Sequence, residues 1–375
     1  MKKCPDLSRC GGCVSMGKPY PEVLKEKENA VRKLFAKENV QPVIGMEDPY
    51  YYRHKVYGTF YKDRKGKIHS GMYAENSHRL TDNTRCLIQH RSANAVLKSI
   101  ADIAERYGIP VYNEDTREGV LRHAYIRVSH DTGDILLVLV IGSKSLPSSK
   151  AIVRELVSQH PQIRTVILNH NREKTSMILG EKEDVLYGKG YITDRIGNTV
   201  FRISSRSFYQ VNPVMTEKLY QTAIGLADLG KDDSVLDVYC GIGTISLLAA
   251  EKCGHVTGVE LNRTAVRDAV QNARNNKISN VSFYAEDAES FMMKMRDVPD
   301  VVFLDPPRSG LSLKTVQSLC TLHPEKIVYI SCNPETQKRD IEQMKKAGYR
   351  AKTIIPVDQF PFTKHVECVV LMSNK

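Results

Sequence analysis

The chain has 375 residues, enough for about two or three domains with a core in each, and its 41% hydrophobic content excludes a disordered or fibrous protein. No apolar stretch approaches the roughly 20 residues of a membrane span, and the N-terminus has no signal-like apolar segment, so we expect a cytoplasmic protein with no membrane partner. The formal net charge of +11 favours an anionic partner.

The first cysteines of the chain, Cys4, Cys10 and Cys13, are spaced Cys-x5-Cys-x2-Cys, with two glycines between the last pair. Three thiols this close together in a reducing compartment indicate metal ligands. A fourth ligand is needed, and Cys86 is the only candidate before the C-terminal half. Four thiolates hold either zinc or a [4Fe–4S] cluster, and the chemistry alone favours zinc slightly.

Residues 20–39 carry apolar side chains at helical spacing, which predicts an amphipathic helix. From about residue 50 to residue 201 the apolar residues mostly alternate with polar ones, which predicts a mostly β domain that also contains helices. The clearest strands are residues 56–61, 124–128 and 135–141, and the helical stretches lie near residues 93–107 and 148–158.

Cations and aromatic rings are interleaved between Arg53 and Lys67. Such a stretch suits phosphates and unstacked bases, so it predicts a contact surface for RNA. The alternative is a solvated basic hairpin. In that case the basic helix around residues 25–37 is the next candidate surface.

After residue 234 strands alternate with helices, which predicts a largely parallel, doubly wound sheet. Two extended runs near the C-terminus, residues 351–357 and 366–372, predict a final hairpin. We therefore expect an α/β protein with a mostly β (α+β) domain at residues 1–204 and a Rossmann-like domain at residues 205–375. The predicted parallel strands are residues 235–239, 256–260, 281–284, 301–304 and 327–330.

The first strand of that sheet ends in a glycine loop, Asp237-Val-Tyr-Cys-Gly241-Ile-Gly243. Glycines let the backbone approach a ligand, although a plain strand-to-helix turn explains such a loop about as often. Glu260 ends the next strand, where a carboxylate accepts both hydroxyls of a ribose. The third glycine of a dinucleotide loop is missing, and the loop resembles that of S-adenosylmethionine-dependent methyltransferases. We therefore expect S-adenosylmethionine to bind at Gly241, Gly243 and Glu260.

Two further strands end in reactive groups at the same edge of the sheet. Asp305-Pro-Pro-Arg308 follows the fourth strand and Ser331-Cys332-Asn-Pro follows the fifth, and ligands bind beyond the carboxyl ends of parallel strands. The helix that begins after Cys332 is expected to lower the pKa of its thiol and favour the reactive thiolate. The alternative for Cys332 is a small buried hydrophobe.

Glu367 stands near the start of the last strand. If this strand runs antiparallel to the others, Glu367 lies at the same edge as the ends of the parallel strands and reaches the cleft that Cys332 faces. A neighbouring apolar strand is then expected to raise the pKa of Glu367 enough for base catalysis near neutrality. The alternative is a solvent-facing carboxylate on an edge strand.

Four motifs in the expected order resemble the RNA uracil-C5 methyltransferase family, whose catalytic domain has the class I methyltransferase fold. By that resemblance Cys332 is the nucleophile and Glu367 is the general base, while the cofactor and base pocket is lined by Gln210, Tyr239, Glu260 and Asp305. The motifs are Ser331-Cys-Asn-Pro with the downstream His-Val-Glu367, Asp305-Pro-Pro-Arg, Tyr239-Cys-Gly-Ile-Gly, and Ser207-Phe-Tyr-Gln-Val-Asn.

The same resemblance implies a [4Fe–4S] cluster in place of zinc on Cys4, Cys10, Cys13 and Cys86. Relatives with an N-terminal β-barrel RNA-binding domain (TRAM) place it before the cysteine motif, so we expect a short form, which favours 23S ribosomal RNA as the substrate. We also expect a monomer. The alternatives are a transfer RNA uracil-C5 methyltransferase, an amine methyltransferase, and an iron–sulfur RNA-binding protein with an inactive methyltransferase half. Arg308, where an aromatic residue would suggest amine methylation, favours methylation of carbon.

Overall fold

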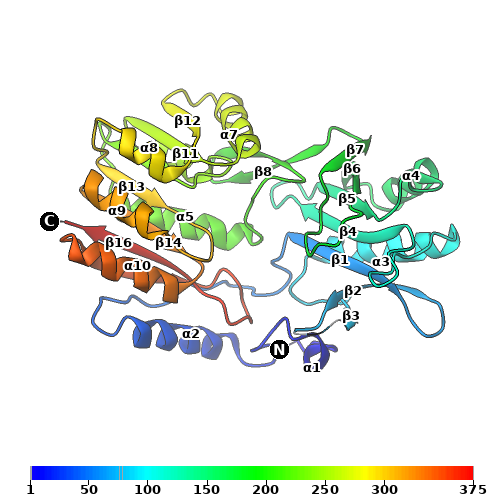
Figure 1. The fold of residues 1–375 in the computed structure, drawn as a ribbon. Coiled ribbons are helices and arrows are strands. Elements are labelled where there is room, and N and C mark those ends of the chain that lie inside the picture. Colours follow the sequence, from blue (N-terminus) through cyan, green and yellow to red (C-terminus); the bar gives the residue numbers. More distant parts are fainter. Residues whose placement is uncertain (1, 76, 78, 375) are drawn as a thin grey trace.

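The computed structural model describes residues 2–75, 77 and 79–374, which contain two seven-stranded sheets lying side by side (Figure 1). The N-terminal sheet has the order β3-β2-β1-β4-β5-β6-β7 and is antiparallel except for the β5–β6 pair, so the β-rich prediction for this half is confirmed. Its strands are β1 (Lys55–Lys62), β2 (Ile68–Tyr73), β3 (Leu80–Asp82), β4 (Leu121–Val128), β5 (Ile135–Ile141), β6 (Ile163–His170) and β7 (Lys182–Tyr187).

The two predicted helices of this half cover one face of the N-terminal sheet. They are α3 (Arg91–Arg106) and α4 (Ser149–Gln159), whose apolar faces bury one core with residues of β4, β5 and β6. The other face packs on a two-stranded hairpin, β8 (Tyr191–Ile196) and β9 (Thr199–Ser204). Side chains of this hairpin also join the core of the second sheet, so the apolar core is continuous between the two sheets.

The C-terminal sheet has the order β12-β11-β10-β13-β14-β16-β15. Its first five strands are parallel, β16 is antiparallel to β14, and β15 forms a hairpin with β16 at the edge. The predicted doubly wound sheet and final hairpin are therefore confirmed. The strands are β10 (Ser234–Val238), β11 (His255–Glu260), β12 (Val281–Ala285), β13 (Val301–Leu304), β14 (Lys326–Ser331), β15 (Arg350–Val357) and β16 (Glu367–Ser373).

Helices cover both faces of this sheet, and its central strands are accordingly continuous apolar runs. One face carries α5 (Pro213–Ala227), α6 (Thr244–Ala250) and α7 (Arg263–Asn275). The other carries α8 (Ala288–Lys294), α9 (Leu313–Leu322) and α10 (Pro334–Lys346). No helix in residues 2–75, 77 and 79–374 is long and apolar enough to cross a membrane.

The N-terminal segment reaches the C-terminal sheet, where α2 (Tyr20–Leu34) lies beside α10 although the two are far apart in sequence (Figure 1). Lys338 Nζ on α10 donates a hydrogen bond to the Leu34 carbonyl at 2.8 Å. α2 ends five residues before the predicted end, because the chain turns to run along the edge strand β15, with the Gln41 N–H donating to the Ile354 carbonyl at 2.8 Å. Covering an open strand edge outweighs local helix propensity here.

Candidate active site

One cavity of about 700 Å³ opens at the carboxyl ends of β10, β13 and β14. Seven of the eight residues predicted to act in catalysis or to bind the cofactor line this cavity. The cavity is large enough for a cofactor together with a nucleobase. The seven residues are Gln210, Tyr239, Gly241, Glu260, Asp305, Cys332 and Glu367.

The glycine loop forms one wall of the cavity. Gly241 adopts φ +56°, and its N–H donates to Glu260 Oε2 at 3.2 Å, which ties the loop to the end of β11. Gly243 does not line the cavity. It adopts φ +80° just before α6, and a Cβ added there would lie 2.9 Å from the Phe283 ring, so the structure assigns it a packing role. A direct contact between Gly243 and the cofactor stays a prediction.

Cys332 lies half-buried in the turn between β14 and α10. The helix begins as predicted, with Pro334 in its first turn and the Asn333 side chain accepting from the Glu335 N–H at 3.2 Å. The same Asn333 side chain donates to the Arg308 carbonyl at 3.2 Å. This hydrogen bond joins the cysteine turn to the loop after β13.

The predicted low pKa of Cys332 is wrong for the free enzyme. Burial, together with the nearby carboxylates of Glu367 and Asp305, raises the pKa of this thiol to about 11, and Arg308 opposes the rise only in part. Charge repulsion and loss of hydration at a partly buried thiol outweigh the favourable end of the helix dipole. The thiol is therefore neutral near pH 7 as long as the cavity holds no additional cation.

Glu367 begins β16 and has only 2% of its surface exposed, so the alternative of a solvent-facing carboxylate is wrong. Ser331 pairs with Cys368 in the antiparallel β14–β16 ladder, which places Glu367 at the same edge of the sheet as Cys332. Burial and the charge of Asp305 raise the pKa of Glu367 to about 8. The predicted position and the raised pKa are confirmed, while its role as a base stays a prediction.

Asp305 faces a tyrosine that the sequence analysis did not identify. Burial raises the pKa of Asp305 to about 7, and a hydrogen bond from Tyr220 opposes that rise. Tyr220 lies on α5, is 4% exposed and lines the same cavity, where burial and the charge of Asp305 raise its pKa well above the ordinary value. The Tyr220 hydroxyl and the Asp305 carboxyl group therefore lie together in the cavity wall, where they offer hydrogen-bonding groups to a bound ring. No local motif distinguishes Tyr220 from the other tyrosines of the chain.

The N-terminal sheet also contributes to the cavity wall. Lys55 begins β1 and lines the cavity, with its Nζ 5.2 Å from the centroid of the Phe208 ring. Burial and the cations Arg127 and Arg53 lower the pKa of Lys55 to about 8. Lys55 belongs to the basic stretch and Phe208 stands two residues before Gln210, but neither pattern indicates that the two side chains meet in the active site.

The basic hairpin at the other end of β1 lies away from this cavity. Lys62, Arg64, Lys65 and Lys67 are exposed around the β1–β2 turn. Because a strand rises about 3.3 Å per residue, Lys62 lies about 23 Å along β1 from Lys55. RNA binding by this hairpin stays a prediction, and it concerns nucleotides distant from the reacting base.

The four N-terminal cysteines line a separate cavity of about 90 Å³, together with apolar side chains such as Met16 and Ile88. Burial and the nearby thiols, of which Cys86 has the largest effect, raise the pKa of Cys13 to about 12, while Arg53 opposes the rise. In the described part of the chain, residues 2–75, 77 and 79–374, no group of three or more His, Cys, Asp or Glu side chains is placed to hold a single metal ion.

Comparison with known proteins agrees with this geometry. A family model described as tRNA (Uracil-5-)-methyltransferase matches residues 19–375. The chain is 40% identical to an uncharacterized RNA methyltransferase of Oceanobacillus iheyensis over 376 residues, which cover 98% of this chain and 82% of that protein. It is also 40% identical to an uncharacterized RNA methyltransferase of Listeria monocytogenes over 379 residues, which cover 98% of this chain and 83% of the relative.

Among solved structures, the chain is similar to the Pyrococcus abyssi tRNA (uracil-54, C5)-methyltransferase in complex with S-adenosyl-L-homocysteine. The TM-score is 0.81, with 24% sequence identity, over 97% of this chain and 86% of that chain. At this identity the likeness concerns the fold. Because it extends over nearly the whole chain, it supports the arrangement of both sheets.

Proposed function

The chain belongs to the tRNA (uracil-5-)-methyltransferase family, and from that membership we propose that it methylates C5 of a specific uridine through a covalent adduct between Cys332 and the base. It is an S-adenosylmethionine-dependent RNA methyltransferase. One observation carries the proposal: Cys332, Glu367 and Asp305 share a single cavity with the glycine loop. A nucleophile and a buried carboxyl group beside a cofactor loop are the groups that methyl transfer to a ring carbon needs. The presence of these groups in one cavity argues against the alternative of an inactive methyltransferase half.

C5 of uracil is a poor nucleophile because its electrons are delocalised in the ring. Addition of the Cys332 thiolate to C6 turns C5 into an enolate-like carbanion. When bound, S-adenosylmethionine would supply the methyl group: the carbanion at C5 would bond to the methyl carbon as the methyl–sulfur bond breaks, and S-adenosylhomocysteine would leave with that electron pair. C5 then carries both a hydrogen and the methyl group. Glu367 removes that proton, the C5–C6 double bond forms again, and the Cys332 sulfur leaves with the electron pair of the C–S bond.

We assign the uracil ring to Gln210, Tyr220 and Asp305, which all line the cavity. An amide, a phenol and a carboxyl group supply donors for the ring carbonyls and an acceptor for the ring N–H. Lys55 adds a cation on the side of the N-terminal sheet, where it stabilises the negative charge that develops on a ring oxygen after addition of the thiolate. Because a paired base cannot reach Cys332, the uridine is single-stranded or flipped out of its helix.

Cys332 must lose its proton before it adds to the base. Arg308 opposes part of the rise in the pKa of this thiol, and the positive sulfonium of bound S-adenosylmethionine would act in the same direction. The thiol is neutral in the free enzyme and is activated when the site is loaded. This order protects Cys332 from oxidation between turnovers, because the thiolate is the form that oxidants attack.

Proton removal from C5 should depend on pH through Glu367. Because burial raises the pKa of this carboxyl to about 8 in the folded enzyme, its basic form is lost as the pH falls below that value. The release of tritium from RNA labelled at C5 of uridine should therefore slow about tenfold per pH unit between about pH 8 and about pH 6. A rate that stays constant over this range would assign proton removal to another group.

We propose 23S ribosomal RNA as the substrate, as the motif resemblance to the RNA uracil-C5 methyltransferase family led us to expect. Transfer RNA is the second candidate, because the family model is named for tRNA and the Pyrococcus abyssi relative is a tRNA (uracil-54, C5)-methyltransferase. Mass mapping of 5-methyluridine in the RNA of a deletion strain separates the two. Loss of one 5-methyluridine from 23S ribosomal RNA supports the first candidate, and loss from tRNA supports the second. Unchanged 5-methyluridine in both RNAs would contradict the proposed function.

We also propose a [4Fe–4S] cluster near the N-terminus, for which the chain provides four thiols and a cation around one cavity of about 90 Å³. The cation is Arg53, whose Nε is buried and has no hydrogen-bond partner. It would offset part of the negative charge of a thiolate-bound cluster and donate to its sulfur atoms. The ligands are Cys4, Cys10, Cys13 and Cys86.

Such a cluster would stiffen a segment that supports the active site. The Val14 and Ser15 N–H groups, directly after Cys13, both donate to the Phe362 carbonyl, at 3.0 and 3.1 Å. Phe362 stands five residues before Glu367. The cluster would therefore have a structural role, and no step of methyl transfer passes through it.

Cys86→Ser should remove the brown colour and the broad absorption near about 400 nm that thiolate-ligated iron gives to protein purified without air. RNA affinity should fall more than S-adenosylmethionine affinity, because the cofactor loop is built from another part of the chain. Cys320→Ser is the matched control, since this free cysteine lies on α9, and its variant should stay coloured. Stoichiometric zinc without iron in the wild-type protein would refute the cluster.

We further propose a monomeric cytoplasmic enzyme, in keeping with an RNA substrate. The proposed domains are residues 1–204, which hold the N-terminal sheet, and residues 205–375, which hold the C-terminal sheet. This division places the boundary directly after β9, which ends at Ser204.

A further inference from the structure

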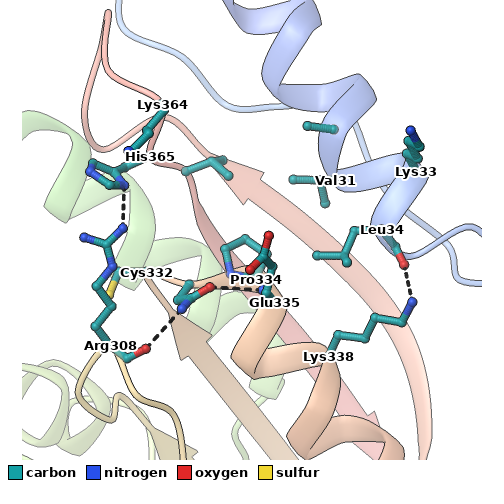
Figure 2. Close-up of a pocket in the computed structure, with 13 residues that line it drawn as sticks. Val31, Lys33, Leu34, Arg308, Cys332, Pro334, Glu335, Lys338, Lys364 and His365 are labelled. Atoms are coloured by element: carbon teal, nitrogen blue, oxygen red, sulfur yellow. Dashed lines mark hydrogen bonds between the residues drawn. The ribbon is translucent and has the colours of Figure 1, made fainter. Parts of the chain in front are cut away.

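A second cavity of about 690 Å³ lies on the other side of Cys332, between α2 and the first turn of α10 (Figure 2). In Figure 2, α2 forms one wall with Val31 and Leu34, and the opposite wall carries Arg308 and His365. We call this cavity the α2–α10 groove. Its walls come from both ends of the sequence, so no local motif indicates it.

The α2–α10 groove is positively charged. Arg308, Lys338 and Lys364 line it, and Lys33 stands at its rim on α2. Glu335 is the one carboxylate among the residues that line it. Lys364 is only weakly neutralised, because its Nζ lies 3.7 Å from a Glu75 oxygen and both side chains are more than half exposed. A phosphate of a bound strand would find several cations at this site.

The surroundings of His365 are also positively charged. An Arg308 guanidinium N–H donates a hydrogen bond to His365 Nδ1 at 2.9 Å. Burial lowers the pKa of His365, and the charges of Arg308, Lys364, Lys27 and Arg53 lower it further. Lys27 is paired with Asp358 at 2.6 Å, so Arg308 and Lys364, which both line the groove, are the charges that make this wall favourable for an anion.

The groove is continuous with the active site. Cys332 and Arg308 line both the groove and the catalytic cavity. A ligand in the groove therefore lies next to the base that reacts with Cys332. A uridine bound in the catalytic cavity is joined through phosphates to its two neighbours. A neighbouring nucleotide therefore lies within one phosphodiester of the reacting base, which is where the groove begins.

The apolar part of the groove suits the rest of a nucleotide. Val31, Leu34 and Pro334 form a surface against which a ribose or a base can pack, while the cations lie on the other wall (Figure 2). A positively charged groove that follows the backbone is typical of proteins that hold single-stranded RNA, and here aliphatic side chains provide the packing surface beside it.

We propose that the α2–α10 groove binds the phosphodiester and nucleoside next to the target uridine on the substrate strand. This inference rests on the proposed function and deepens it. The exposed hairpin at residues 62–67 then contacts only distant parts of a large RNA. The groove sets the position of the strand at the reacting base, and the nucleotide that fits it contributes to the choice of uridine.

The double variant Lys338→Ala/Lys364→Ala tests this inference. The affinity for a short oligouridylate is measured by fluorescence anisotropy over a salt series. The slope of log affinity against log salt concentration should become shallower by about 0.7 for each phosphate contact removed. At about 0.1 M salt this slope corresponds to about fivefold weaker binding per contact, relative to a 1 M reference. Lys338 also holds α2 through the Leu34 carbonyl, so Lys364→Ala alone is measured as well and should lose about fivefold.

The matched control is Lys346→Ala/Lys352→Ala, which removes the same charge from exposed lysines outside the groove. Calorimetry of S-adenosylhomocysteine binding should give the wild-type affinity for every variant. If the groove variants bind the oligouridylate with the affinity and salt slope of the control, the groove does not hold RNA. A groove that binds polyglutamate in preference to oligouridylate would also overturn the inference. Methyl transfer to RNA from the deletion strain is measured separately with the wild-type enzyme, so failure of the proposed function is recognised independently.

Discussion

Cys332→Ala is expected to abolish methyl transfer, with a loss of about 10⁴-fold or more, as is typical when a covalent nucleophile is removed. The remaining groups of the site cannot replace the thiol, because without addition at C6 no carbanion forms at C5. S-adenosylmethionine binding should stay nearly unchanged. The cofactor loop at Gly241 follows β10 and is tied to Glu260 at the end of β11, away from the cysteine turn. Cys332 is half-buried, so truncation to alanine leaves a small space that water can enter.

The measurement combines a methyl-transfer assay on RNA from the deletion strain with calorimetry of cofactor binding. Cys320→Ala is the control, since Cys320 lies on α9 and does not line the catalytic cavity. A Cys332→Ala enzyme that still methylates RNA would contradict the covalent mechanism and favour direct transfer to an amine, as in the alternative raised by Asp305-Pro-Pro. Loss of cofactor binding together with activity would show that Cys332 supports the cofactor pocket and would leave the nucleophile unassigned.

The meeting of Cys332 and Glu367 follows from the sequence because two simple rules suffice. Parallel strands bring their carboxyl ends to one edge, and a final antiparallel strand brings its first residues to the same edge. The register of Ser331 with Cys368 realises this arrangement. Both rules depend on strand order and direction, which the alternation of strands and helices along the chain already indicates.

The ionisation of Cys332 does not follow from the sequence, because it depends on distances between groups that no local pattern relates. The helix after Cys332 is where the sequence places it, yet Glu367 and Asp305 approach the thiol and, with burial, reverse the direction of its pKa shift. Lys55 and Tyr220 were missed for the same reason. They reach the cavity from β1 and α5 through packing between the two sheets and have no motif of their own.

The extent of α2 illustrates a different limit. Its helical pattern continues beyond Leu34, but the observed helix stops there so that the following residues can hydrogen bond along β15. A sequence pattern measures local preference, whereas an open strand edge contributes hydrogen bonds that local preference does not include. The same tertiary contact places α2 beside α10 and so creates the groove next to Cys332.

Glu367→Gln is expected to trap the enzyme on its RNA. Addition of Cys332 and methylation of C5 do not require a base at position 367, but removal of the C5 proton does, so turnover should fall about 10²- to 10⁴-fold while the adduct accumulates. The fold should tolerate this change well. Since the pKa of Glu367 is raised to about 8, the side chain is largely neutral near pH 7 in the free enzyme, and glutamine has the same shape and charge.

The adduct should appear on a denaturing gel as a protein band shifted by the mass of the RNA and dependent on S-adenosylmethionine. Cys332→Ala/Glu367→Gln should lose the shifted band, because the bond to RNA runs through the Cys332 sulfur. Glu342→Gln, an exposed glutamate on α10, is the matched control and should turn over as the wild type does. A Glu367→Gln enzyme with the wild-type rate would remove the base assignment. A slow enzyme that never forms the shifted band would instead place Glu367 before the methylation step, where it would act on the Cys332 thiol.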